Sequence, residues 1–325
     1  MKIGPTTQVQ MLTIPADREG QRLDNLLITL LNGVPKSRIY RILRKGEVRI
    51  NKGRVKPEYK VKAGDLLRLP PIKDATKPTQ TVNSKLQKVK QLDQAIIQME
   101  KNLLALNKPS GIAVHGGSGL KFGVIEGLRA LHPDWPYLEL VHRLDRETSG
   151  VLLIAKRRST LRWLHQQLRE KQIRKKYWCL VHGNWPSTLS KIDAPIASGK
   201  GGGGERRMKI SSEGKDSITR FRLLACHENT SLIEAEPITG RTHQIRVHCL
   251  SAGFPIVGDT KYVSQNNLLE REKKMQVSRL MLHARSLIFK VSEEAESTKI
   301  FAPIEPAYQK LLIELGYEDL AKDKE

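Results

Sequence analysis

The sequence predicts an α+β protein built from two domains. At 325 residues, the chain is long for a single hydrophobic core. Apolar runs of strand length and helical stripes follow one another in mixed order, which favours the α+β class. A polar, basic stretch without an apolar period interrupts them and is typical of a linker. We therefore expect an N-terminal tail at 1–17, a small module at 18–80, a linker at 81–100 and a larger domain at 101–320.

The small module should contain two helices followed by short strands. In its first helix, leucines at three- and four-residue spacing form one apolar stripe: Leu23, Leu26, Leu27, Leu30 and Leu31. A second helix is predicted over 37–45, where apolar residues also recur at helical spacing and Gly46 can take the left-handed C-terminal position. The segment 47–51 alternates like a strand.

The larger domain mixes strands and helices. Its strand candidates are 103–106, 138–141, 151–155 and 177–181. Leu161, Leu164 and Leu168 predict a helix, and a later helix should end at Gly253. The pairing of the strands does not follow from these patterns.

Charge points to a polyanionic partner. The chain has 56 Lys and Arg against 34 Asp and Glu, a formal net charge of +22, and residues 1–80 alone hold 17 basic and 7 acidic residues. Such an excess favours nucleic acid, with an anionic membrane surface as the alternative. No apolar run approaches the roughly 20 residues that span a bilayer.

The second predicted helix concentrates this charge. Its charged residues are all basic, with no interleaved glutamate: Lys36, Arg38, Arg41, Arg44 and Lys45. A solvated helix face is the simpler interpretation, but same-sign clustering is typical of a phosphate-binding surface, and we favour RNA binding by these five residues.

Cysteine and histidine spacing argues against a metal site or a disulfide framework. Cys179, Cys226 and Cys249 are scattered and form no CxxC pair. His243 and His248 are five residues apart, which is poor spacing for two ligands on one helix face. The N-terminus lacks the apolar core of a secretion signal, so we expect a cytoplasmic protein with reduced thiols and no bound metal.

The segment 140–150, LVHRLDRETSG, places dense charge between two apolar strands. Loops held between buried strands often carry catalytic groups. From these residues alone, Asp145 is more simply explained as an ion-pair partner of Arg143 or Arg146 that fixes the loop.

A resemblance to a known family reverses that balance. The run HRLDRETSGVLLIAK is similar to the catalytic motif of pseudouridine synthases of the ribosomal large-subunit type. The resemblance implies that Asp145 is the catalytic carboxylate and that Arg143 fills the gap left by a flipped nucleotide. The Lys-Lys-Tyr run at 175–177 resembles the family's strand whose tyrosine packs on the uracil ring, which implies this role for Tyr177.

Two later blocks and the N-terminal module extend the resemblance from about 18 to 317. PITGRTHQIRVH, at 237–248, is similar to the family block whose first arginine pairs with the catalytic carboxylate, here Arg241. RLMLHA, at 279–284, resembles the closing motif and implies that Leu282 shapes the base pocket. The residues from Arg22 to Asn51 resemble an S-four-like RNA-binding domain. The implied architecture is this small domain followed by a catalytic domain on a mixed, mainly antiparallel β-sheet.

The implied activity is isomerisation of specific uridines to pseudouridine in large-subunit (23S) ribosomal RNA or its assembly precursor, by a monomer without a cofactor. The reaction needs a carboxylate near the ribose, as nucleophile or base, and a neighbouring cation that favours its ionised form. A non-enzymatic RNA-binding protein with an inactive synthase domain and a base glycosylase are the alternatives. Two departures from the family pattern, Gly201–Gly204 and Val263, affect loop shape rather than the implied catalytic positions.

Overall fold

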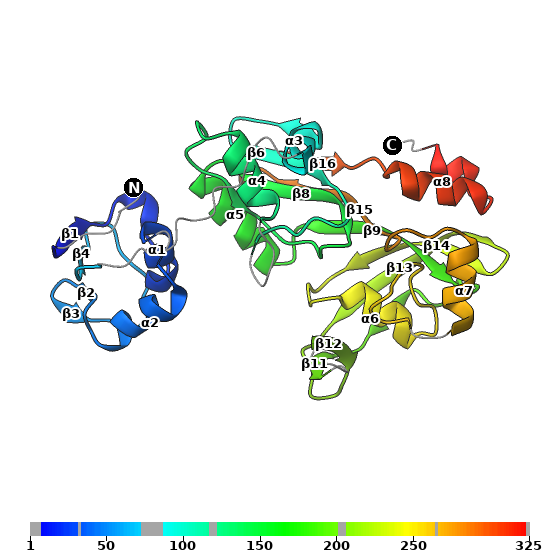
Figure 1. Cartoon of the computed structure of the whole chain (residues 1–325), viewed down its shortest axis with the longest axis horizontal. Coiled ribbons are helices and arrows are strands. Elements are labelled where there is room, and N and C mark those ends of the chain that lie inside the picture. Colours follow the sequence, from blue (N-terminus) through cyan, green and yellow to red (C-terminus); the bar gives the residue numbers. More distant parts are fainter. Residues whose placement is uncertain are drawn as a thin grey trace. The chain divides into compact units, whose positions relative to one another are not determined.

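A computed structural model of the chain describes residues 8–31, 34–72, 87–116, 122–200, 206–263 and 266–322 (Figure 1). The chain divides into two compact units, residues 1–82 and 83–325. The run Gly201–Gly204, one of the two departures from the family pattern, lies outside the described residues.

The N-terminal unit combines a four-stranded sheet with two helices. The strand order is β1-β4-β2-β3, with antiparallel pairing throughout: β1 (Gln10–Thr13), β2 (Arg49–Ile50), β3 (Gly53–Arg54) and β4 (Leu66–Leu69). A short 3-10 helix, η1 (Ala16–Arg18), follows β1. Strand β1 lies within the stretch 1–17 that the sequence suggests as a tail, and its pairing with β4 makes it part of this sheet.

The two helices of this unit, α1 (Leu23–Leu30) and α2 (Lys36–Arg44), follow the predicted apolar stripes. Their buried leucines and isoleucines share one core with the sheet. Helix α2 ends as expected, because Gly46 adopts a φ of +69° that side chains with a Cβ rarely take. The small unit therefore has its own hydrophobic core.

The larger unit is built on a ten-stranded sheet. Eight strands follow the order β10-β13-β14-β9-β15-β8-β6-β5, with β16 paired to β15 and β7 paired to β8. Their bounds are β5 (Ile96–Met99), β6 (Leu103–Lys108), β7 (Glu139–Leu140), β8 (Ser149–Ala155), β9 (Arg174–His182), β10 (Lys191–Asp193), β13 (Ile218–His227), β14 (Thr230–Pro237), β15 (Leu282–Lys290) and β16 (Ser297–Phe301). A separate hairpin joins β11 (Ile196–Lys200) to β12 (Arg206–Ile210).

One junction in this sheet is parallel. Strands β8 and β15 pair in parallel, with His283 opposite Ser149 and Ala284 opposite Gly150, whereas the other paired strands of the described sheet are antiparallel. Gly150 has a φ of +106°, and a Cβ there would lie 2.2 Å from the backbone oxygen of Ala284. The close junction thus requires glycine, and the predicted mixed, mainly antiparallel sheet is confirmed.

Helices cover both faces of β8, every residue of which is buried. Leu152 and Ile154 share a core with α3 (Gln87–Gln94) and α4 (Val124–Leu131). Val151 and Leu153, on the opposite face, pack with α5 (Arg158–Arg169). Because successive strand residues point to opposite faces, the continuous apolar run 151–155 is that of a strand buried on both sides.

Helix α3 and strand β5 occupy the stretch 81–100 that the sequence suggests as a linker. In α3, Val89 and Leu92 are fully buried although most of its residues are polar. Leu92 packs against Gly127 of α4, where a Cβ would lie 2.5 Å from the leucine Cδ1. This helix therefore covers the sheet of the larger unit.

The remaining helices come after β14 in the chain (Figure 1). They are α6 (Gln244–Ser251), α7 (Asn266–Lys274), α8 (Pro306–Glu314) and α9 (Glu318–Ala321). Helix α6 is followed by Gly253 with a φ of +86°, close to the predicted end. Within the described ranges, none of the helices combines the length and apolarity needed to cross a membrane.

Candidate active site

Asp145 lies on the loop 142–148 between β7 and β8. The loop backbone is held firmly, because three successive carbonyl groups accept hydrogen bonds. Asp145 O accepts from Thr148 N (3.2 Å), Arg146 O from Gly111 N (2.8 Å) and Glu147 O from Ser110 Oγ (2.6 Å). Leu144, immediately before the aspartate, is 5% exposed and packs in the core. The loop thus presents Asp145, whose side chain is 19% exposed, from a fixed backbone.

Two basic side chains of a distant segment, His243 and Arg246, lie beside the Asp145 carboxylate. His243 Nε2 lies 3.8 Å and Arg246 Nη1 lies 4.0 Å from Asp145 Oδ2. The two arginines of the loop lie elsewhere: Arg146 Nε contacts Glu147 Oε1 at 2.9 Å, and Arg143 is exposed. The ion pair within the loop that the residues alone suggest is therefore replaced by contacts to the start of α6.

Arg246 is fixed by a buried carboxylate, Asp259. Arg246 Nε and Nη2 donate to Asp259 Oδ2 and Oδ1 at 2.8 and 2.6 Å. The two side chains are 4% and 1% exposed. Burial lowers the pKa of Arg246, but the hydrogen bonds and charge of Asp259, together with the charge of Asp145, raise it above its ordinary value. The third guanidinium nitrogen is thereby held toward Asp145 as a permanent positive charge.

Arg241 does not make the contact that the resemblance implies. Its side chain is exposed, and its Nε donates to Asp216 O at 3.1 Å. Helix α6 begins only at Gln244, after His243 at its N-cap with a φ of +55°. Arg241 therefore precedes the helix, whereas Arg246 lies in its first turn and is buried beside Asp145. The guanidinium next to the carboxylate is that of Arg246.

His243 completes this group with an aromatic neighbour. His243 Nδ1 lies 2.7 Å from the hydroxyl of Tyr262, whose ring also lies 5.0 Å from the Arg246 guanidinium carbon. Burial lowers the pKa of His243, although the charge of Asp145 opposes that shift. Arg246, His243, Asp259 and Tyr262 were not among the site residues predicted from sequence. Of these four, only His243 and Arg246 lie within a motif block, PITGRTHQIRVH at 237–248.

Tyr177 and Leu282 share one face of the sheet. Strands β9 and β15 pair Tyr177 with Ala284 and Cys179 with Leu282, and residues two apart on a strand point to the same face. Leu282 is 4% exposed, whereas Tyr177 is half-buried. Burial raises the pKa of Tyr177, and the Asp145 charge raises it further, so this ring lies within electrostatic reach of the carboxylate. The structure thus places Tyr177 and Leu282 on one face of the sheet, with the Asp145 charge within reach of the Tyr177 hydroxyl.

The other histidines have structural partners. His142 Nε2 accepts a hydrogen bond from Leu153 N at 3.1 Å, and burial lowers its pKa to about 4. His248 lies 2.9 Å from Thr219 Oγ1 through Nδ1. Among the described residues, no group of three or more His, Cys, Asp or Glu side chains is arranged to hold a metal ion.

Helix α2 carries the predicted RNA-binding residues in the N-terminal unit. Its apolar residues Ile39, Ile42 and Leu43 are buried. The basic residues lie on the remaining surface, with Arg38 half-buried and four others exposed: Lys36, Arg41, Arg44 and Lys45. The helix therefore presents a positively charged face to solvent.

Comparisons with known proteins agree on one family. Residues 102–251 match the family model described as RNA pseudouridylate synthase, and residues 21–67 match that of the S4 domain. The chain is 53% identical over 304 residues to the ribosomal large subunit pseudouridine synthase C of Pasteurella multocida, covering 94% of this chain and 93% of that protein. The Escherichia coli K12 protein of the same name is 50% identical over 311 residues, covering 95% and 98%.

A solved structure gives a consistent picture. Human RNA pseudouridylate synthase domain containing 4 superposes with a TM-score of 0.58 and 28% sequence identity, covering 70% of this chain and 95% of that one. The structural likeness therefore extends over 70% of this chain, well beyond the motif blocks.

Proposed function

The chain belongs to the RNA pseudouridylate synthase family, and from this premise we propose that it converts specific uridines of large-subunit ribosomal RNA to pseudouridine, with Asp145 as the catalytic carboxylate. The substrate is assigned from the names of the similar proteins of Pasteurella multocida and Escherichia coli. The role of Asp145 is supported by its position on a fixed loop beside Arg246 and within electrostatic reach of Tyr177, which come from two other segments.

The reaction breaks the bond between ribose and uracil N1, turns the base and rejoins it through C5. No hydride or external group is transferred, so side chains suffice for the chemistry. A carboxylate at the ribose starts the reaction either by attack on the sugar or by removal of a sugar proton. Both routes need the negative charge of Asp145 to persist in a partly buried place. Arg246, 4.0 Å away and itself fixed by Asp259, supplies the compensating positive charge.

The remaining predicted residues act on the base. Tyr177 lies on the same sheet face as Leu282, so the ring stacks on uracil while the leucine forms the floor of the pocket. A uridine in structured RNA must leave its stack first, at a cost of a few kcal/mol. The exposed Arg143 side chain, two residues before Asp145, fills the vacated space. Arg241, also exposed, is reassigned from the carboxylate to contact with the RNA backbone.

The activity is tested by tritium release from C5-labelled uridine in large-subunit ribosomal RNA. Asp145→Asn should lower the rate at least about 1000-fold, because the amide is neither a nucleophile nor a base, while RNA binding is retained. Asp193→Asn is the matched control, since Asp193 is half-exposed on β10 and pairs with Lys191. An Asp145→Asn protein of normal rate would refute the assignment. Absence of release by the unaltered protein would favour a non-enzymatic RNA-binding role, and free uracil would indicate a glycosylase.

The basic face of α2 is proposed to bind phosphates of the same RNA. In the full-length chain, replacing Arg41, Arg44 and Lys45 with Gln should weaken binding and reduce the slope of log K against log salt by about 2 to 3, roughly 0.7–0.9 for each lost phosphate contact. Lys310→Gln and Lys322→Gln, at exposed positions of α8 and the C-terminal end, serve as controls. An unchanged slope in the triple variant would mean that α2 is only a solvated face.

The remaining assignments concern the setting of the reaction. We assign it to a monomer in the cytoplasm, acting on ribosomal RNA or its assembly precursor. The three thiols are free in this chain, as suits a reducing compartment: Cys179, Cys226 and Cys249. Sedimentation of the protein alone and with the RNA measures the stoichiometry, and a dimer at working concentration would contradict the monomer.

A further inference from the structure

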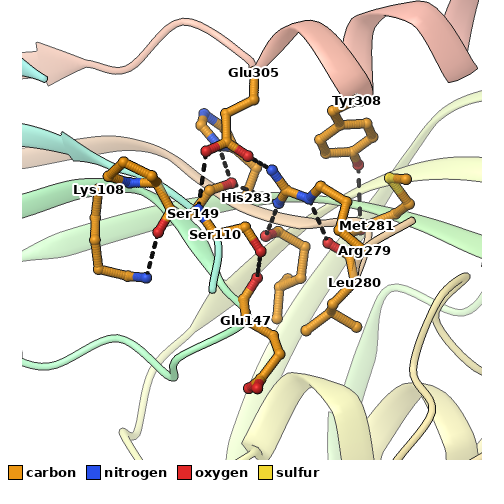
Figure 2. A network of polar contacts seen from close by, with 12 residues as sticks. Lys108, Ser110, Glu147, Ser149, Arg279, Leu280, Met281, His283, Glu305 and Tyr308 are labelled. Carbon is orange, nitrogen blue, oxygen red and sulfur yellow. Dashed lines mark hydrogen bonds and ion pairs between the residues drawn. The ribbon is translucent and has the colours of Figure 1, made fainter. Parts of the chain in front are cut away.

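We propose that Arg279 and Glu305 are positioning residues that hold the Asp145 loop in register with the base-pocket strand. The inference rests on the proposed function for the role of the loop. Neither side chain is among the residues predicted from sequence to act in the reaction. They form the centre of a polar network that adjoins the loop, shown in Figure 2. The guanidinium and the carboxylate are in direct ionic contact, with the side chains 8% and 21% exposed.

Arg279 connects the end of the loop to the start of β15. Its Nη2 donates to Ser149 Oγ at 2.7 Å, four residues after Asp145, and approaches Leu282 O at 3.4 Å. Its Nε donates to Leu280 O at 3.0 Å. One planar guanidinium therefore ties the first residue of β8 to the backbone of the proposed base-pocket leucine.

Glu305 extends the connection to the other side of the loop. This residue is the N-cap of α8, and its Oε1 accepts a hydrogen bond from Ser110 N at 2.9 Å. The hydroxyl of Ser110 donates to Glu147 O at 2.6 Å, two residues after Asp145. The Arg279–Glu305 pair thus reaches the loop by two routes, one through Ser149 and one through Ser110 (Figure 2).

Neighbouring side chains reinforce the position of Ser149. The ring of His283 is fully buried, and burial lowers its pKa to about 3, so it is neutral. Its Nε2 lies 3.1 Å from Ala302 O and donates there, which leaves Nδ1 to accept from the Ser149 hydroxyl at 2.8 Å. The Ser149 oxygen in turn accepts from Arg279. Each donor in this series of hydrogen bonds has only one available acceptor role opposite it, so the Ser149 hydroxyl has a single defined orientation.

The charge of Glu305 also bears on Lys108, a second basic side chain within the electrostatic reach of Arg279. Lys108 is fully buried and donates to three backbone oxygens: Pro109 O, Ile112 O and Arg146 O. Burial, and next the positive charge of Arg279, lowers the pKa of Lys108 to about 7. Removing the Glu305 carboxylate would increase the repulsion between the buried guanidinium and this lysine, which donates to the carbonyl of Arg146, the residue after Asp145.

These contacts act on the rate of the reaction rather than on RNA affinity. They fix the backbone on which Asp145 stands relative to Leu282, while the Arg279 side chain is only 8% exposed and the Glu305 carboxylate is engaged by Arg279 and Ser110 N. A displacement of reacting groups by about 1 Å can reduce a rate by roughly 100-fold. We therefore expect altered kcat with an almost unchanged KM.

The test compares three variants of the full-length protein. Glu305→Gln keeps an acceptor for Ser110 N but removes the charge opposite Arg279, and should lower kcat about 10- to 100-fold with KM for ribosomal RNA within about twofold. Arg279→Lys keeps the charge but cannot reach all its partners at once, and should behave similarly. The combined variant should lose less than the product of the two single losses, because both changes break one connection.

Tyr317→Phe is the matched control for looser docking of the C-terminal helices. The Tyr317 hydroxyl donates to Thr230 O at 2.7 Å and anchors this end of the chain without contacting the loop. Its removal should lower the melting temperature and leave kcat unchanged. If Tyr317→Phe reduces kcat as much as Glu305→Gln does, the Arg279–Glu305 pair has only a structural role and the proposal fails.

Amide hydrogen exchange provides a readout that does not depend on pseudouridine formation. The amides of Thr148 and Gly111, which bond the loop carbonyls, should exchange at least about 10-fold faster in Glu305→Gln, while those of β14 stay protected. Unchanged exchange, or faster exchange with unchanged kcat, would overturn the proposal. If Glu305→Gln does not fold, Ser110→Ala tests the same route from the loop side. Lack of tritium release by the unaltered protein would refute the function alone, because exchange still reports on the loop.

Discussion

Replacing Asp259 with Asn should destabilise the larger unit much more than replacing Asp145 with Asn. Asp259 binds Arg246 through two charged hydrogen bonds of 2.6 and 2.8 Å, and both side chains are almost fully buried. Removing one partner of a buried pair costs about 3–5 kcal/mol, because the remaining charge has lost its compensation. For a unit of this size, about 1 kcal/mol corresponds to a shift of roughly 2–4 °C, so the melting temperature should fall by about 6–20 °C.

Asp145→Asn should have a small effect on stability despite its large effect on activity. Asp145 is 19% exposed and lies 4.0 Å from an arginine whose much closer partner is Asp259. At this distance the attraction is about 1 kcal/mol in water and about 4 kcal/mol in a protein-like environment. Removing the carboxylate also relieves its repulsion from Asp259, so we expect a net change within about 1 kcal/mol.

Differential scanning calorimetry and urea unfolding of the two variants, together with tritium release, measure both quantities. Asp259→Asn should also reduce the rate, because Arg246 is no longer held toward the loop. Equal destabilisation by the two substitutions would refute the reasoning. It would mean that Asp145 is chiefly a structural ion-pair partner, the role that its own loop residues suggest without the family resemblance.

Three further predictions concern stability. His283 has a folded pKa of about 3 against about 6.5 when unfolded, so it takes up a proton on unfolding below pH 6.5. Its contribution to the free energy of unfolding should therefore fall by about 2 kcal/mol between pH 7.5 and 5. Urea unfolding of His283→Asn should show that much less dependence on pH. Gly150→Ala should lower the free energy of unfolding by about 3 kcal/mol or more. Gly253→Ala should lower it by only about 1 kcal/mol, because φ is also positive there but a Cβ meets nothing within 4 Å. Similar melting temperatures of the two variants would contradict the close β8–β15 junction. Asp65→Ala removes an acceptor for Asn51 Nδ2, Tyr59 OH and Lys62 N, and should lower the unfolding transition of the N-terminal unit by about 3 kcal/mol while that of the larger unit stays in place.

Elements with a strong apolar period were predictable from sequence. The stripes of α1 and α2 and the continuous apolar run of β8 reflect burial on one face and on both faces, respectively. Helix α3 was missed because only Val89 and Leu92 mark its buried side within a polar stretch. Two residues three apart are too few to distinguish a helix from a linker until the partner surface on α4 is known.

The choice between two arginines in one block shows a second limit of sequence. Arg241 and Arg246 are five residues apart, and motif spacing alone does not say which one reaches the loop. The decisive feature is local: His243 takes a left-handed conformation, so the helix starts at Gln244 and its first turn points Arg246 inward. Asp259, which fixes that arginine, lies in a turn with no periodic pattern to reveal it. Its role depends on a tertiary contact.

The residues that build the site come from both nearby and distant parts of the chain. The backbone of the Asp145 loop is held by groups from 108–111, which adjoin it through the pairing of β6 with β8. Its compensating positive charge comes from Arg246, which Asp259 holds in place, and the proposed link to the base pocket comes from Arg279 and Glu305. Because the long-range contacts form only when both halves of the sheet meet across the β8–β15 junction, a fragment ending before β15 could form the loop but not the complete site. The position of Asp145 is therefore a property of the whole larger unit, although the run that identifies it, HRLDRETSGVLLIAK, is 15 residues long.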